Sequence, residues 1–116
     1  MTVLVVEDNF LTAMHLEGML AEMGFEVSLA NNLAEAFAML GLKPPRLAIL
    51  DVNLGRDLVF PVAAELRARQ IPIVFSTGCG LHQFPSEWVN YPIVPKPLNI
   101  EALISTLRAI NFALPR

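Results

Sequence analysis

The sequence lacks the long apolar runs, the signal segment and the basic stripes that would direct a chain to a membrane or to nucleic acid. No run approaches the roughly 18 apolar residues that cross a bilayer. The start, Met1-Thr2-Val3, has neither the charged region nor the long apolar stretch of a signal peptide. The eight basic residues are scattered, and the net charge is −3. We therefore expect no membrane segment and no direct contact with nucleic acid.

Cysteine is almost absent. Cys79 is the only one, which excludes an internal disulfide and fits a reducing cytoplasm, where we expect the protein to act. Linkers, internal repeats and low-complexity tracts are also missing. The 116 residues, 54% of them hydrophobic, are enough to bury one core. We therefore expect a single domain over residues 1–116.

Short apolar runs alternate with segments of helical spacing. Strands are predicted at 3–6, 25–29, 47–50, 73–76 and 92–95. Strands that alternate with helices favour a parallel sheet with helices on both faces. The predicted fold is an α/β flavodoxin-like (βα)5 three-layer sandwich with a five-stranded parallel sheet.

Helix boundaries are suggested by a few residues. Asn32 and Asn99 can cap the second and last helices, and Gly24 can end the first. Apolar spacing predicts a third helix over 58–66, in which Pro61 is tolerable only near the first turn.

The stretch 78–91 is a poor helix because it holds two glycines and Pro85, so any helix there should be short or mobile. Phe84 and Trp88 within this stretch are expected in a satellite core or on a partner surface.

Polar groups follow four of the predicted strands. In chain order they are Glu7-Asp8, Asp51, Thr77 and Lys96. The carboxyl ends of the strands in open α/β sheets are where such folds bind ligands. We therefore expect these groups to meet at one edge of the sheet.

Carboxylates brought together in this way would attract a cation. Like charges about 4 Å apart repel by roughly 4 kcal/mol at an effective dielectric near 20, and hard oxygen ligands favour Mg²⁺ over zinc. Asp51 is then a candidate nucleophile toward phosphorus. Lys96 would neutralise charge on the transferring phosphoryl group, and the Thr77 hydroxyl could hydrogen-bond that group.

On these residues the sequence resembles the receiver domain of bacterial two-component response regulators, over essentially its whole length. The matching motifs are Glu7-Asp8, Asp51, Thr77-Gly78 and Lys96-Pro97. The resemblance implies that Asp51 is the phosphoacceptor, and that the donor is a histidine kinase or a phosphotransfer protein. It also implies that the protein is no enzyme toward external substrates and promotes only its own phosphorylation and dephosphorylation.

The resemblance further implies a set of metal ligands and a switch. Mg²⁺ would be held by Asp8, Asp51 and the backbone carbonyl of Asn53, with Glu7 acting mainly through water. Thr77 would move toward the phosphoryl group. A cis peptide is implied at Lys96-Pro97.

Two features depart from the usual receiver pattern. Receivers usually carry a switch aromatic three residues before the lysine, and this chain has Ile93 there. Phe75-Ser76-Thr77-Gly78 resembles a receiver subset whose fourth strand reads Phe-Ala-Thr-Gly and which commonly lacks that aromatic.

Residues beside the phosphoacceptor are expected to modulate the reaction. Gly78 is the small residue after the switch threonine. We expect Asn53 and Cys79 to flank the approach of water to phosphorylated Asp51 and to set the lifetime of the phosphoryl group.

Two other functions are compatible with an α/β fold of this kind. Haloacid-dehalogenase-like phosphatases use similar groups, but their nucleophile lies on the first strand with a second carboxylate two residues later, where this chain has Asn53. An unphosphorylated receiver-like interaction module would lose the acids or the lysine, all of which this chain keeps.

The output is expected to reach a downstream protein. The resemblance implies that the partner binds the surface of the fourth helix, fifth strand and fifth helix, and a homodimer is left open. Because the chain ends at Arg116, soon after the last helix, we favour a stand-alone receiver over a piece of a longer protein. The weak segment 78–91 suggests activation by ordering of that segment.

Overall fold

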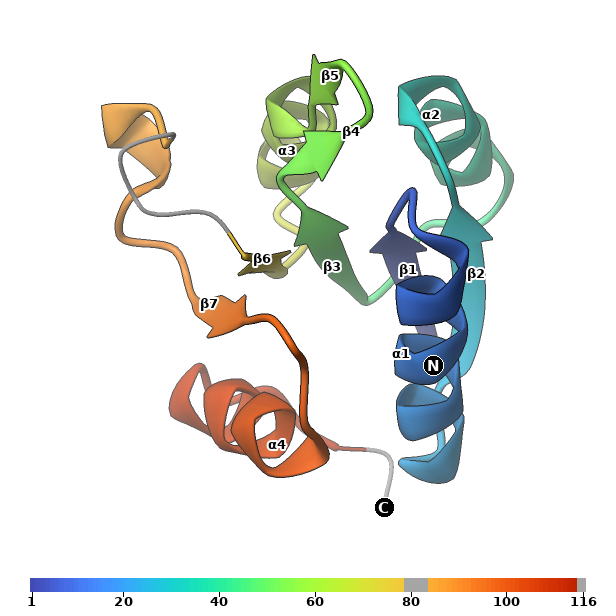
Figure 1. The fold of residues 1–116 in the computed structure, drawn as a ribbon, viewed down its shortest axis with the longest axis vertical. Helices are drawn as coiled ribbons and strands as arrows, with labels where there is room; N and C mark the ends of the chain where they lie inside the picture. Colours follow the sequence, from blue (N-terminus) through green and yellow to red (C-terminus); the bar gives the residue numbers. More distant parts are fainter. Residues whose placement is uncertain (79–83, 115–116) are drawn as a thin grey trace.

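A central sheet of five parallel strands organises the molecule. In the computed structural model, which describes residues 1–78 and 84–114, the strand order is β2-β1-β3-β6-β7 (Figure 1). The strands are β1 (Thr2–Val6), β2 (Glu26–Ala30), β3 (Leu47–Asp51), β6 (Ile73–Thr77) and β7 (Ile93–Pro95). Every neighbouring pair in this sheet is parallel. The predicted flavodoxin-like α/β fold is confirmed.

Helices cover both faces of the sheet. They are α1 (Phe10–Glu22), α2 (Leu33–Leu42), α3 (Phe60–Ala68) and α4 (Ile100–Ala109). The helices α1 and α4 pack on one face, and α2 and α3 pack on the other (Figure 1). Side chains alternate along a strand. Val3 and Val5 therefore pack in the core under α1 and α4, while Leu4 and Val6 pack in the core under α2 and α3. None of the helices in the described part is long and apolar enough to span a membrane.

Asparagine caps begin three of the helices. Oδ1 of Asn32 accepts a hydrogen bond from the backbone N–H of Glu35, and Oδ1 of Asn99 accepts one from that of Ala102, as expected. Asn9 caps α1 in the same way. Gly24 ends α1 with a φ of 96°, which a residue with a Cβ adopts only at a cost.

The start of the third helix differs from the prediction. Leu58 does not belong to α3 but to β5 (Asp57–Leu58), which pairs antiparallel with β4 (Asn53–Leu54) in a small hairpin. Leu58 is 45% exposed. Its spacing of four residues to Val62 therefore does not place both side chains on one buried helical face. The helix begins at Phe60 instead, and Pro61 lies in the first turn, where its missing N–H is harmless.

The segment after β6 is short of helix, as predicted. Within its described part, the single turn η2 (Ser86–Trp88) is a 3₁₀ helix. Phe84 and Trp88 are both buried and belong to the core on the α2 and α3 side. The core interpretation of these two residues is therefore confirmed.

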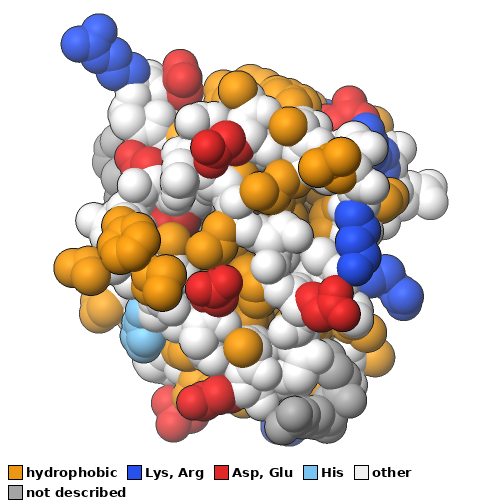
Figure 2. Space-filling view, turned by 90° about the vertical axis from the view of Figure 1, so that its right-hand side faces the viewer, with side chains coloured by type: hydrophobic (Ala, Val, Ile, Leu, Met, Phe, Trp, Pro, Cys, Tyr) orange, Lys and Arg blue, Asp and Glu red, His pale blue; other side chains and the backbone are white. Residues whose placement is uncertain are grey.

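Apolar side chains are also exposed at the start of α1. Phe10 and Leu11 are 72% and 77% exposed, and Met14 one turn later is 47% exposed. Figure 2, which views the molecule from the α1 and α2 side, shows exposed apolar side chains gathered beside a histidine. We call Phe10, Leu11 and Met14 the α1 apolar patch. Patches of this kind often mark interaction sites.

Candidate functional site

The carboxyl ends of four strands meet at one edge of the sheet and assemble the site. Asp51 is the last residue of β3, and Thr77 is the last residue of β6. Glu7 follows β1 directly, and Lys96 follows β7. Asp51 stands opposite Ser76 in the parallel register, which places Asp51 beside the end of the neighbouring strand. The convergence expected from the strand order is therefore observed.

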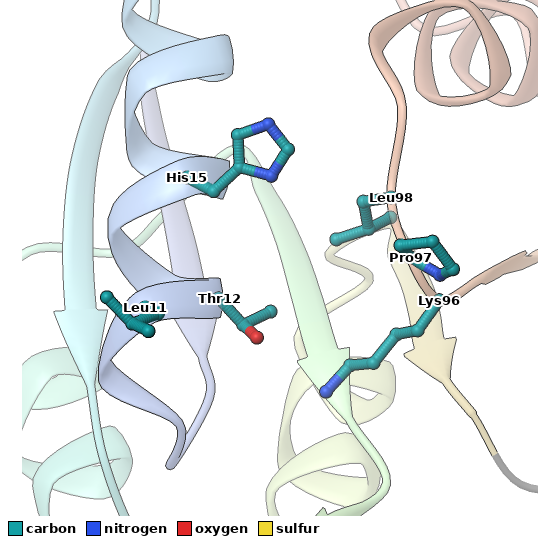
Figure 3. A pocket seen from close by; sticks show the side chains of 6 residues that line it. All are labelled: Leu11, Thr12, His15, Lys96, Pro97 and Leu98. Carbon is teal, nitrogen blue, oxygen red and sulfur yellow. The ribbon is translucent and has the colours of Figure 1, made fainter.

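Lys96 connects two of the carboxylates. Its Nζ lies 2.8 Å from Oε1 of Glu7 and 3.1 Å from Oδ2 of Asp51. The side chain extends from the end of β7 toward the neighbouring strand ends (Figure 3). Only 24% of it is exposed, so its charge is partly shielded from water and acts strongly on the two acids.

Glu7 is a buried acid held from two sides. The backbone N–H of Asn9 donates a 3.1 Å hydrogen bond to Oε2, while Lys96 contacts Oε1. Burial raises the pKa of Glu7 above 4.5, and the hydrogen bonds from Lys96 and Asn9 offset only part of this effect. Asp51 nearby raises the pKa further, because two negative charges would repel.

The same contacts also change the pKa of Lys96, and here they outweigh the effect of burial. Burial lowers the pKa of its ammonium group, but the hydrogen bond with Glu7 and the attraction to Asp51 outweigh burial. The net result is a pKa above the ordinary 10.5. Lys96 is therefore a permanent cation at neutral pH, next to the predicted nucleophile.

Asp8 is positioned by the hairpin rather than by the lysine. The backbone N–H of Gly55 donates a 2.8 Å hydrogen bond to Oδ2 of Asp8. Gly55 lies in the turn of the β4–β5 hairpin with a φ of 64°, a conformation that favours glycine. Asn53 begins β4, two residues after Asp51. The hairpin thus connects the strand that ends in Asp51 to an exposed acid of the first loop.

The acids fit a divalent cation. Glu7, Asp8 and Asp51 each offer one carboxylate oxygen, and these three atoms all lie within 4.8 Å of one another. Oxygen ligands alone suit hard cations such as Mg²⁺ or Ca²⁺. The residues present at this edge can therefore hold a metal at an acidic pocket.

The residues expected to form the switch lie on β6 and β7. Thr77 is buried at the end of β6, and Gly78 after it is exposed, with no described atom within 4 Å of where a Cβ would stand. Ile93 is half-buried at the start of β7, opposite Phe75 in the register. The peptide between Lys96 and Pro97 is cis, as expected. Cys79, predicted to modulate the site, lies outside the described residues.

Two positioning residues were missed in the sequence. Asn9 caps α1 and also donates its backbone N–H to Glu7. The asparagine beside the acid pair was a usable capping signal. Gly55 could have been found from the dipeptide Gly55-Arg56 between Asn53-Leu54 and Asp57-Leu58, because a glycine first in a two-residue turn is a hairpin signal.

A hollow of about 460 Å³ opens on the α1 side of the lysine. Thr12 and His15, one turn apart on α1, point toward the loop that follows β7 (Figure 3). His15 is exposed, in keeping with a surface histidine. The hollow is lined by Leu11, Thr12, His15, Lys96, Pro97 and Leu98. It adjoins the α1 apolar patch through Leu11.

Comparison with known proteins identifies relatives of the whole chain. Residues 3–108 match the response regulator receiver domain family. The probable transcriptional regulator ycf27 of Cyanophora paradoxa is 33% identical over 114 residues, which cover 90% of this chain and 47% of that protein. This chain thus spans about half the length of that curated relative.

Solved structures agree with this match. The solution structure of SdrG from Sphingomonas melonis Fr1 has a TM-score of 0.84 and 35% identity, and the match covers 95% of both chains. A response regulator from Burkholderia pseudomallei, solved with a phosphorylated aspartic acid, a calcium ion and citrate, has a TM-score of 0.79 and 26% identity. That match covers 91% of this chain and 65% of the other.

Neither these relatives nor the family match supports a phosphatase of the haloacid-dehalogenase type. The five-stranded parallel sheet, the strand-end acids and the lysine match the receiver pattern throughout the described residues. The chain therefore belongs to the response regulator receiver domain family, the signalling modules of two-component systems.

Proposed function

We propose that Asp51 accepts a phosphoryl group from the phosphohistidine of a histidine kinase or a phosphotransfer protein. The observation that carries this proposal is the contact of Asp51 with Lys96 at 3.1 Å inside a cluster of acids. Asp51 is 7% exposed, so its surroundings exclude most water. A shielded nucleophile beside a fixed cation suits phosphoryl transfer.

In the transfer step a carboxylate oxygen of Asp51 attacks phosphorus. A bond forms between that oxygen and phosphorus while the bond from phosphorus to the imidazole nitrogen of the donor breaks. The electron pair of the broken bond stays on the imidazole, which takes up a proton. Lys96 stabilises the negative charge on the phosphoryl oxygens, and Glu7 keeps the ammonium group in place before the donor arrives.

The reaction is expected to need Mg²⁺. Asp8, Asp51 and the backbone carbonyl of Asn53 would hold the ion, with Glu7 acting through water, and the ion would neutralise charge on the phosphoryl oxygens. Gly55 supports this arrangement because its N–H fixes one oxygen of Asp8. The phosphorylated aspartate and calcium ion in the Burkholderia relative support the same chemistry here.

The donor in this proposal is a protein. The α1 apolar patch begins three residues after Glu7 and adjoins the hollow beside Lys96. A partner that covers this patch would bring its phosphohistidine to the edge of the sheet where Asp51 lies. We expect this exchange to take place in the cytoplasm, as predicted from the cysteine content.

Once phosphorylated, the domain acts as a switch rather than as an enzyme on external substrates. The Thr77 hydroxyl is expected to move toward the phosphoryl group, and residues beside it, namely Asn53, Gly78 and Cys79, to tune how fast water removes that group. A downstream protein, or a second copy of the chain, would then bind the surface formed by the η2 region, β7 and α4.

The test is covalent phosphate uptake from acetyl phosphate, measured with and without Mg²⁺. Wild type should take up phosphate only with the metal, and Asp51→Asn should take up none. Asp57→Asn is a matched control, because Asp57 is an exposed acid in the hairpin and should leave uptake unchanged. Uptake by Asp51→Asn at the wild-type level would refute the assignment.

A further inference from the structure

Five aromatic rings form a cluster on the α2 and α3 side of the sheet. Phe75 of β6 lies at its centre, with ring centroids 5.2 Å from Phe84, 5.9 Å from Phe60 and 6.0 Å from both Trp88 and Tyr91. Trp88 and Tyr91 lie 5.0 Å apart. Three of the five rings therefore come from one short segment, residues 84–91.

The contacts of this segment with the sheet are made by its side chains. Among the described residues, the N–H of Trp88 donates to the carbonyl of Pro85 and that of Tyr91 to the carbonyl of Trp88, within the segment, and the first backbone bond to β6 is at Pro92, whose carbonyl accepts from the N–H of Phe75. Trp88 itself is 1% exposed. Burial of the rings is what keeps 84–91 against the sheet, because aromatic side chains contribute large apolar areas.

Arg67 of α3 contacts two residues of this segment, Trp88 and Glu87. Its guanidinium carbon lies 4.3 Å from the centroid of the Trp88 ring, and its Nη1 lies 3.7 Å from Oε2 of Glu87. The ion pair is exposed and therefore weak, but the guanidinium also covers the indole face, a favourable arrangement for a cation. Arg67 thus holds the segment through the ring as well as through the charge.

The attached state also contains an unfavourable feature. The indole N–H of Trp88 is buried and has no hydrogen-bond partner among the described residues. A buried donor without a partner loses its bond to water and gains nothing in return. Moving Trp88 outward would restore that bond, which brings the attached and detached states closer in free energy.

The aromatic cluster is joined directly to β6, the strand that ends in Thr77. Residues 75 and 77 lie on the same face of β6, because side chains alternate along a strand, so the Thr77 side chain stands next to Phe75 on that face. In the register Phe75 pairs with Leu50, and Ser76 pairs with Asp51. A movement of Thr77 toward Asp51 therefore disturbs the strand position against which Trp88 packs.

We propose that residues 84–91 form a latch, the Trp88 latch, which is closed before phosphorylation and is released when Asp51 is phosphorylated. This inference rests on the proposed function. It gives the chain a replacement for the aromatic switch absent at position 93, since Ile93 has no ring to rotate and the rings of the latch pack on Phe75, two residues before Thr77. The direction is opposite to the expected ordering of segment 78–91, because the described part of that segment is already packed in the core.

Trp88 is the only tryptophan, so its fluorescence reports the latch alone. Wild type and Asp51→Asn are treated with acetyl phosphate and Mg²⁺, and phosphate uptake and acrylamide quenching are measured on the same samples. We expect a severalfold rise in the quenching constant and a shift of the emission to longer wavelength in phosphorylated wild type only.

The two readouts separate the two proposals. Full phosphate uptake with unchanged quenching would overturn the latch and leave the phosphoacceptor function intact. Absence of uptake would overturn the phosphoacceptor assignment and, with it, the latch, which depends on phosphorylation of Asp51.

Arg67→Gln tests the latch without touching the site. We expect this variant to show raised quenching before phosphorylation and faster amide exchange at Trp88 and Tyr91, with phosphate uptake equal to wild type. Arg46→Gln removes an exposed arginine elsewhere and should match wild type in all three measurements. Wild-type quenching and exchange in Arg67→Gln would overturn the role of Arg67 in closing the latch.

Discussion

The ammonium group of Lys96 lies closer to Oε1 of Glu7, at 2.8 Å, than to Oδ2 of Asp51, at 3.1 Å. Glu7 is the more deeply buried of the two acids. The shorter ion pair of Lys96 is therefore with Glu7, which is not the predicted nucleophile. In the proposed function, this ammonium group would shift from Glu7 toward a phosphoryl group attached to Asp51.

Replacement of this lysine should separate metal binding from phosphoryl transfer. We expect Lys96→Met to slow phosphate uptake about 100-fold, the usual effect of removing one group that stabilises developing charge. Its affinity for Mg²⁺ should be equal to or higher than that of wild type, because a cation has been removed from beside the acids. Calorimetric titration with Mg²⁺ and uptake from acetyl phosphate measure the two quantities.

Lys43→Met is the control for that experiment. Lys43 pairs with Glu26 at 3.0 Å, and both side chains are largely exposed. Such pairs contribute little, so uptake should be unchanged. A wild-type rate in Lys96→Met would contradict the role given to Lys96.

Stability should depend on pH through Glu7. Its pKa is raised in the folded protein above the 4.5 of the unfolded chain, so its favourable contribution is complete below pH 4.5 and is lost as pH rises through the folded value. Glu7→Gln, which resembles the protonated acid, lacks this loss. In buffer with a chelator, the free energy of unfolding of wild type should therefore fall relative to Glu7→Gln as pH rises from 4.5.

Urea unfolding of both proteins across this range measures the difference. Lys96 does not disturb the comparison, because its pKa lies above 10.5. A difference between the two proteins that is independent of pH would show that burial does not control the titration of Glu7.

Two glycines offer a matched pair for testing the hairpin. A Cβ at Gly55 or at Gly41 would meet nothing within 4 Å among the described atoms, so any effect must come from the backbone. Gly55 has a φ of 64°, and Gly55→Ala should lower the free energy of unfolding by about 1–2 kcal/mol. Gly41 lies in α2, and Gly41→Ala should raise it by about 0.5 kcal/mol.

The same pair tests the metal site. Gly55→Ala strains the turn whose N–H holds Asp8, so its affinity for Mg²⁺ should fall, while Gly41→Ala should bind the ion as wild type does. Unchanged affinity in Gly55→Ala would mean that Asp8 is positioned without help from the hairpin.

The indole N–H of Trp88, which has no hydrogen-bond partner among the described residues, has a consequence for stability. Trp88→Ala should lower the free energy of unfolding by about 3–5 kcal/mol, as for other buried aromatic residues. Trp88→Phe should cost less than half as much, because it also removes a buried donor whose burial costs about 1–3 kcal/mol. Urea unfolding followed by circular dichroism compares the variants, and equal losses would argue that the N–H carries no penalty.

Much of the fold could be predicted because the central strands are buried on both faces. Continuous apolar runs such as 47–50 then have few alternatives, and Asn32 and Asn99 mark helix starts by their capping chemistry. The hairpin was missed because its strands have two residues each, too few to show a period. Leu58 was assigned to the third helix because its spacing to Val62 and Leu66 fitted a helix, and the sequence does not show that Leu58 is exposed.

The site was predictable in its members but not in its contacts. Side chains at strand ends can be read from the order of the strands, which is why Asp51 and Lys96 were found. The supports of Glu7 and Asp8 are backbone N–H groups, and every residue except proline has one. The closer contact of Lys96 with Glu7 than with Asp51 is a property of the finished packing, which no sequence pattern contains.

The residues of the site are spread from Glu7 to Lys96. Lys96 directly follows β7, a three-residue strand at the edge of the sheet. Under the proposed function, a copy of the chain in which β7 has not joined the sheet would lack the ammonium group beside Asp51. Such a copy is expected to take up phosphate as slowly as Lys96→Met, so rapid phosphorylation would depend on completion of the sheet at this edge.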